Sequence, residues 1–124
     1  MKALAVALQV GRTGNETLRI TRARALVEGS NPIIYTHAIG THGHGAGPWI
    51  GAGEGQSGAQ GLGDYPINPN TAWLIELAAI RAVPEWKGKD VRFPLEVDGF
   101  FDGTSFRWID GRRTELLRIP RTTR

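Results

Sequence analysis

The fold is decided by the stretch Trp73-Leu74-Ile75-Glu76-Leu77-Ala78-Ala79-Ile80, an apolar run interrupted by one carboxylate. Periodicity alone does not separate a buried strand from a helix in so short a run. Pro66 and Pro69 precede the run and Pro84 follows it, and proline does not continue a helix. The run is therefore predicted to be a strand of limited length.

A second strand is predicted downstream, from Val91 to Phe101. It leads into Asp102-Gly103, a dipeptide typical of a tight hairpin turn. Residues Phe106 to Ile109 would then form the return strand. The carboxyl-terminal half is thus expected to be antiparallel sheet.

A helix is predicted upstream, over residues 14–28. Thr13 and Glu16 have the spacing of a capping box, in which each side chain bonds the other's backbone amide. Gly29 ends the helix because glycine tolerates the left-handed conformation. A further helix is expected to end within Lys2–Leu8. The expected buried positions of the longer helix are Leu18, Ala23, Leu26 and Val27.

Composition places the chain, residues 1–124, among single-domain globular proteins, with 40% hydrophobic and 22% charged residues. Its fold class is predicted to be α+β. The chain has no Cys, so any metal must be held by His and carboxylate side chains. No apolar run approaches the roughly 20 residues that span a bilayer, and we expect a cytoplasmic protein.

The formal net charge is +3. Several arginines lie near the carboxyl terminus: Arg112, Arg113, Arg118, Arg121 and Arg124. Acidic residues are interspersed through the rest of the chain, so these arginines are interpreted as solvated surface rather than a nucleic-acid site.

Three histidines fall within a glycine-dense segment, residues 36–64: His37, His42 and His44. In an extended chain, His42 and His44 would face the same side. Glycines between histidines indicate that the backbone passes close to another group. The alternative is a polar loop with ordinary surface histidines.

Glu76 and Glu96 each lie among apolar neighbours. A carboxylate on a buried strand is costly unless it is paired or binds a metal. If the two predicted strands share a sheet, Glu76 and Glu96 could converge with a His on one cation. The alternative is an edge strand with Glu76 facing water.

The ordered set Gly43–Gly47, Asn70–Glu76 and Val91–Asp98 resembles the pita-bread metallopeptidases, the superfamily of prolidase, Xaa-Pro aminopeptidase, creatinase and methionine aminopeptidase. Pro84–Trp86 and Asp110–Leu117 resemble a prolidase-like branch. The resemblance extends from about Gly11 to the end of the chain and covers the carboxyl-terminal half of that fold. It implies one or two helices packed on a curved, mostly antiparallel sheet.

The resemblance also implies a site. His44, Glu76 and Glu96 would be metal ligands, with His42 as the alternative ligand if the His segment is aligned two residues earlier. His37 would lie on the substrate side, so His37 and His42 are the candidate catalytic residues. The cofactor would be one or two divalent ions of Mn, Co, Zn or Fe. The reaction would be hydrolysis of a peptide, amide or ester carbonyl by metal-activated water.

Two departures from the family pattern matter. The family takes two Asp ligands from strands upstream of the His, and this chain begins after that point. Seven residues after His44, where many members place a substrate-side His, stands Gly51.

The alternatives are therefore an active hydrolase, a catalytically incomplete remnant or binding module, and a fragment that needs a complementary amino-terminal half. Half of the fold would expose an apolar face, which predicts a homodimer.

Overall fold

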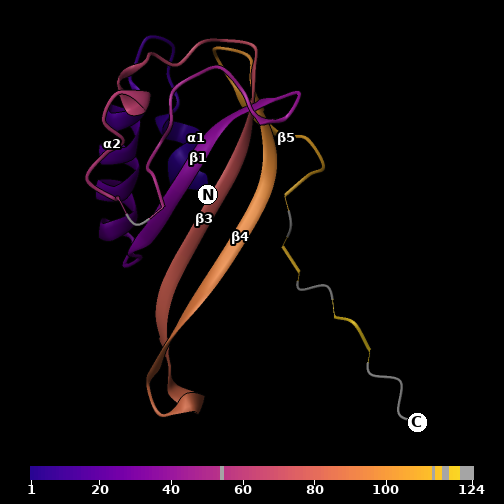
Figure 1. The fold of residues 1–124 in the computed structure, drawn as a ribbon. Coiled ribbons are helices and arrows are strands. Elements are labelled where there is room, and N and C mark those ends of the chain that lie inside the picture. Colours follow the sequence, from indigo (N-terminus) through magenta and orange to yellow (C-terminus); the bar gives the residue numbers. More distant parts are fainter. Residues whose placement is uncertain (54, 113, 116–117, 121–124) are drawn as a thin grey trace.

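The structure, a computed structural model, describes residues 1–53, 55–112, 114–115 and 118–120 (Figure 1). Within these residues, two helices accompany a curled, antiparallel five-stranded sheet. The helices are α1 (Lys2–Ala7) and α2 (Gly14–Val27). The strands are β1 (Pro32–Gly40), β2 (Gly43–His44), β3 (Thr71–Val83), β4 (Lys89–Phe101) and β5 (Phe106–Trp108). The predicted α+β class is confirmed.

The strands lie in the order β2-β1-β3-β4-β5, so β3 is central. β3 and β4 pair along their full length, from Thr71 opposite Phe101 to Val83 opposite Lys89. β1 pairs with β3 only as far as Ala79, which lies opposite Pro32. The rest of β3 and β4 continues past β1 as a two-stranded ribbon (Figure 1).

Both predicted strands are longer than expected, because pairing between β3 and β4 extends each one past its apolar core. The return strand, predicted for Phe106 to Ile109, is β5. β1 was not predicted, because its carboxyl-terminal part runs into the glycine-dense segment.

The capping box at the start of α2 is confirmed. The backbone amide of Glu16 donates to Thr13 Oγ1 at 3.1 Å, and the Thr13 amide donates to Glu16 Oε2 at 2.8 Å. Gly29 has φ +73°, the left-handed conformation expected beyond the helix. The predicted helix within Lys2–Leu8 is confirmed as α1.

The predicted buried face of α2 is only partly correct. Leu18 is buried, but Ala23 is exposed, and Leu26 and Val27 are 53% and 90% exposed. The helix buries the stripe formed by Thr17, Leu18, Thr21 and Ala25, whose helical spacing puts them on one side. The pattern of apolar residues did not predict this stripe, because two of its four members, Thr17 and Thr21, are polar.

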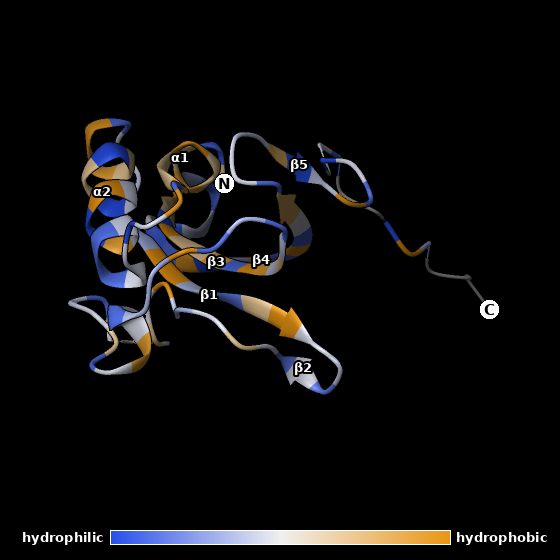
Figure 2. Cartoon of the chain, turned by 90° about the horizontal axis from the view of Figure 1, so that it is seen from above, coloured by the Kyte–Doolittle hydropathy of each residue, from blue (hydrophilic) through white to orange (hydrophobic). Residues whose placement is uncertain are grey.

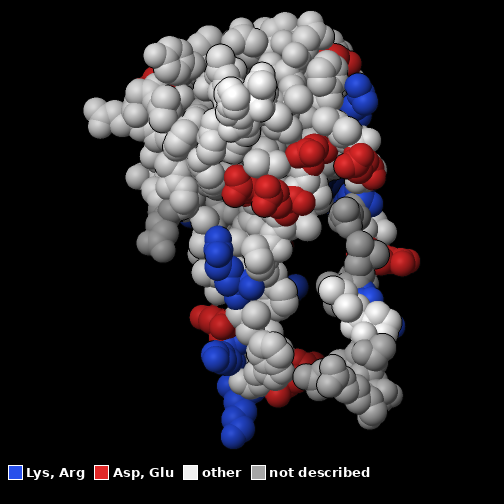
Figure 3. Space-filling view, turned by 45° about the vertical axis from the view of Figure 1, so that its right-hand side comes forward, with Lys and Arg blue, Asp and Glu red and all other residues white. Residues whose placement is uncertain are grey.

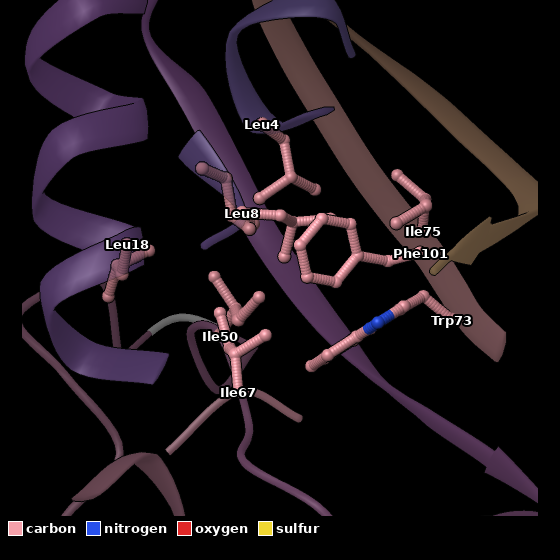
Figure 4. Close-up of a cluster of buried hydrophobic side chains, with 9 residues drawn as sticks. Leu4, Leu8, Leu18, Ile50, Ile67, Trp73, Ile75 and Phe101 are labelled. Carbon is pink, nitrogen blue, oxygen red and sulfur yellow. The ribbon is translucent and has the colours of Figure 1, made fainter. Parts of the chain in front are cut away.

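The helices cover one face of the sheet, and the core lies between them (Figure 2). α1 and α2 contribute leucines, and the sheet contributes Trp73, Ile75 and Phe101 (Figure 4). The complete cluster consists of Leu4, Leu8, Leu18, Ile34, Ile50, Ile67, Trp73, Ile75 and Phe101. Alternate residues of the same strands point to the opposite, open face.

In the part of the chain that is described, neither helix has the length and apolarity that a bilayer-crossing segment needs. The sequence interpretation of the basic tail lies partly outside the described residues, since Arg113, Arg121 and Arg124 are not among them.

Candidate functional site on the open face of the sheet

Three strands place polar side chains in one row on the open face. Tyr35 of β1 lies opposite Glu76 of β3, which lies opposite Glu96 of β4. Directly opposite residues of antiparallel strands point to the same face, with Cβ atoms about 4.5–5.5 Å apart. The expectation that Glu76 and Glu96 meet in one sheet is confirmed.

Acidic side chains extend this row. Two hollows of about 360 and 440 Å³ meet at Glu96. Glu76 lines the first hollow, while Asp98 and Asp110 line the second. Acidic side chains gather in one band of the surface, above a region richer in Lys and Arg (Figure 3). The carboxylates are therefore concentrated rather than scattered.

Glu76 is neither deeply buried nor on an edge strand. β3 is the central strand, yet the Glu76 side chain is 33% exposed because the helices cover only the other face. The sequence left two alternatives, a carboxylate on a buried strand and a carboxylate facing water from an edge strand. The structure shows neither, because Glu76 is partly exposed on a central strand.

Glu76 faces His37 rather than His44. His37 Nε2 lies 3.5 Å from Glu76 Oε1, and the His37 side chain is 2% exposed. His37 Nδ1 lies 2.9 Å from the carbonyl oxygen of Ala38. A carbonyl only accepts hydrogen bonds, so Nδ1 carries the proton and donates. In the neutral ring, Nε2 then directs a lone pair towards the carboxylate, and a proton or a cation between the two groups would stabilise them.

His44 lies over His37. The two imidazole rings stack with centroids 3.9 Å apart, and His44 Nε2 is 2.6 Å from the Tyr35 hydroxyl. Burial raises the pKa of Tyr35, and the negative charge of Glu76 raises it further. The Tyr35 hydroxyl therefore stays protonated. In the His44 tautomer that carries its ring proton on Nδ1, this hydroxyl donates a hydrogen bond to His44 Nε2.

Trp49 completes an aromatic cluster with Tyr35, His37 and His44. Its ring centroid is 5.3 Å from that of Tyr35 and 5.6 Å from that of His44. The backbone of the adjacent Ile50 pairs with Thr36 through two hydrogen bonds, which places Trp49 beside β1. Backbone pairing thus fixes the position of the cluster.

The structure does not bring all the predicted site residues together. Glu76 and Glu96 are neighbours, but among the described contacts none joins His44 to either carboxylate. His42 lies exposed in the turn between β1 and β2. Within the described ranges, no three His, Cys, Asp or Glu side chains are close enough to hold one metal ion. Among the described residues, the pair His37–Glu76 joins a candidate histidine to a candidate carboxylate, with Nε2 and Oε1 3.5 Å apart.

Two residues of the site were missed. Tyr35 stands two positions before His37, so a strand assignment for β1 would have placed both on one face. Trp49 had no such signal, because its position depends on long-range pairing of Ile50 with Thr36.

The expectation that glycines between the histidines allow close backbone approach is confirmed at Gly40 but not at Gly43, where an added Cβ would meet nothing within 4 Å. Further along the segment, a Cβ added at Gly45 would lie 2.6 Å from the carbonyl oxygen of Ile39, and one at Gly51 would lie 2.0 Å from that of Ile34. Gly51 also has φ +77°. The glycine-dense segment is therefore packed against β1.

Comparison of the chain with family models, with curated proteins and with solved structures finds no match in any of the three.

Proposed function

We propose that this chain belongs to a metal-dependent hydrolase and that His37 and Glu76 hold a divalent cation, with Glu96 beside them. The carrying observation is the 3.5 Å separation of His37 Nε2 from Glu76 Oε1. The fixed tautomer of His37 supports the same interpretation, because it leaves Nε2 available as a metal donor.

The donor atoms fit a shared cation. Two donors each about 2.1 Å from a tetrahedral ion lie about 3.4 Å from each other. The separation of His37 Nε2 from Glu76 Oε1 is 3.5 Å. Imidazole and carboxylate donors suit Zn, Mn, Co or Fe(II), and the chain offers no thiolate. The chemistry of the donors and their separation therefore support one ion at this pair.

When bound, such an ion supplies Lewis acidity and a water molecule acidified towards neutral pH for attack on a carbonyl. The protein's own groups have distinct tasks. His37 and Glu76 hold the ion, and the Ala38 carbonyl fixes the His37 ring. His44, held by Tyr35, offers an imidazole on the solvent side of the pair for proton transfer to the leaving group.

The assignment changes the roles that the resemblance implied for two histidines. His44 follows His37 by seven residues, the spacing at which many pita-bread metallopeptidases place a substrate-side His after the ligand. With His37 as the ligand, His44 occupies that substrate-side position. The substrate class is then a peptide, amide or ester, as proposed for a half pita-bread fold of the prolidase type.

One observation favours a second candidate, a catalytically incomplete binding module. Across residues 1–53, 55–112, 114–115 and 118–120, no third His, Asp or Glu side chain is placed so that it could bind the same ion as His37 and Glu76. A two-donor site binds metal weakly unless another chain adds ligands. Uptake of metal separates the two candidates.

A second chain is part of the proposal. Phe93 and Leu95 of β4 are 51% and 38% exposed, although they lie on the same face of the sheet as the core residue Ile75. A homodimer or a complementary amino-terminal half would cover these side chains. Sedimentation of the purified protein distinguishes a dimer from a monomer.

The test of the metal site is calorimetric titration of metal-free protein with Zn²⁺ and Mn²⁺. The informative variant is Glu76→Gln, which preserves size and removes the charge. We expect wild-type protein to bind about one ion and the variant to bind at least about 10-fold more weakly. The matched control is Asp98→Asn, on the same face, which should bind like wild type. If both variants bound metal equally weakly, the affinity would come from the overall negative charge of this face and not from Glu76 as a ligand. If wild-type protein took up no metal, the incomplete binding module would be favoured.

A further inference from the structure

We propose that a groove beside Trp49 is a binding subsite for a neutral aromatic side chain of the substrate. The identity of the adjoining reaction centre rests on the function proposed above. The groove itself rests on separate residues and is testable without metal.

The groove has a volume of about 590 Å³, within the range of roughly 300–1,000 Å³ typical of small-molecule sites. Trp49, Leu62 and Tyr65 form its apolar walls. Gly45, Ala46, Gly47, Pro66 and Asn68 complete the lining. Leu62 is 45% and Tyr65 58% exposed, so this surface is open to a ligand.

The lining selects for a neutral, flat group. None of the described lining residues carries a charge, although acidic side chains are concentrated nearby on the sheet. A charged substituent would lose hydration here without gaining a partner. The rings of Trp49 and Tyr65 can instead stack on an aromatic group, and the Asn68 amide offers one polar contact.

The groove adjoins the candidate reaction centre through Trp49. The Trp49 side chain lines the groove and also stacks against the His44 ring. The His44 ring in turn stacks on His37 of the candidate reaction centre. A substrate with its carbonyl near His37 and Glu76 would therefore direct a neighbouring side chain towards the groove. This continuity argues for a substrate subsite rather than a docking surface for another protein.

The walls are held in place without a ligand. Trp49 donates its backbone amide to the Leu62 carbonyl at 3.0 Å. The amide of Gly45 donates to the Ala38 carbonyl at 2.7 Å. On the far wall, Asn15 Nδ2 donates to Asp64 Oδ1 at 2.7 Å, and Gly14 donates to the Tyr65 carbonyl at 3.3 Å. A preformed site loses less conformational entropy on binding.

The experiment is a titration of ¹⁵N-labelled, metal-free protein with N-acetyl-L-phenylalaninamide, followed through the indole N–H signals of the four tryptophans. We expect a saturable shift of the Trp49 signal, with the signal of exposed Trp86 unchanged. The charged analogue N-acetyl-L-aspartic acid α-amide, which keeps its side-chain carboxylate, should leave Trp49 unshifted. Parallel shifts of Trp49 and Trp86, or equal binding of both probes, would overturn the proposal.

Variants make the result specific. Tyr65→Ala should weaken binding roughly threefold to tenfold, the value of one aromatic contact. Trp86→Ala, which removes an equally exposed ring on the ribbon, should bind like wild type. An unchanged signal from buried Trp73 establishes that Tyr65→Ala is folded, and unchanged affinity of that folded variant would overturn the proposal. Glu76→Gln should still bind the probe, so a missing metal site and a missing groove give different results.

Discussion

The two faces of β3 differ although they belong to one strand in the centre of one sheet. Trp73 and Ile75 are 0% and 1% exposed beneath the helices. The next residue, Glu76, points to the opposite face, and its side chain is 33% exposed. The covered face supplies the core, and the open face supplies His37 and the carboxylates. Position in the sheet therefore does not determine a residue's role here; the face on which the helices lie does.

The largest expected effect is on the covered face, where Trp73→Ala should lower the free energy of unfolding by about 3–5 kcal/mol. Trp73 is fully buried in the cluster between sheet and helices, so its removal leaves a cavity. Denaturant unfolding provides the measurement. Trp86→Ala is the matched control and should change stability by less than about 0.5 kcal/mol, because Trp86 is 60% exposed. Similar losses in the two variants would break the contrast between packed and open surface.

A smaller effect is expected at Gly99, which shows how tightly the covered face packs. A Cβ at this position would lie 2.0 Å from Cζ of Phe106, so the ring must move. Gly99→Ala should cost about 1–3 kcal/mol in thermal or denaturant unfolding. If the clash is the cause, Phe106→Leu should cost less in the Gly99→Ala protein than in wild type. Strict additivity of the two changes would contradict it.

The smallest expected effect concerns the open face and sharpens its electrostatic character. Burial and the charge of Glu76 raise the pKa of Tyr35 above its ordinary 10.0. Glu76→Gln should lower that pKa partway, since burial remains. Ultraviolet titration in a Tyr65→Phe background isolates Tyr35, because the chain has two tyrosines.

The same pKa shift has a consequence for stability. The native state holds the Tyr35 proton more tightly than the unfolded state does. This contribution is fully present below pH 10 and is lost as the pH rises through the raised pKa. An unchanged Tyr35 titration in Glu76→Gln would place the carboxylate too far away to act on this face.

Much of the fold follows from local signals in the sequence. The capping box of Thr13 and Glu16, the glycine that ends α2 and the hairpin at Asp102-Gly103 are short-range patterns with direct backbone causes. The sequence also suggested that Glu76 and Glu96 could converge if their strands shared a sheet, and the register of β3 and β4 places them directly opposite each other. These features need no knowledge of distant partners.

The rest depends on pairing between distant segments. β1 meets β3 across residues 41–70, and that pairing alone brings His37 to Glu76. The resemblance made His44 the expected ligand, with His42 as the alternative, whereas the structure places His37 at Glu76 and stacks His44 on His37. Spacing along the chain identified the types of residue at the site but not which histidine faces Glu76.

The long ribbon of β3 and β4 also bears on the order in which the chain folds. Only residues 84–88 separate its two strands, whereas β1 and β3 are separated by residues 41–70. The entropy lost on closing a loop grows with its length, and hairpins form within microseconds. The ribbon can therefore assemble early as a local template, on which β1 docks later and carries His37 to a carboxylate already in place.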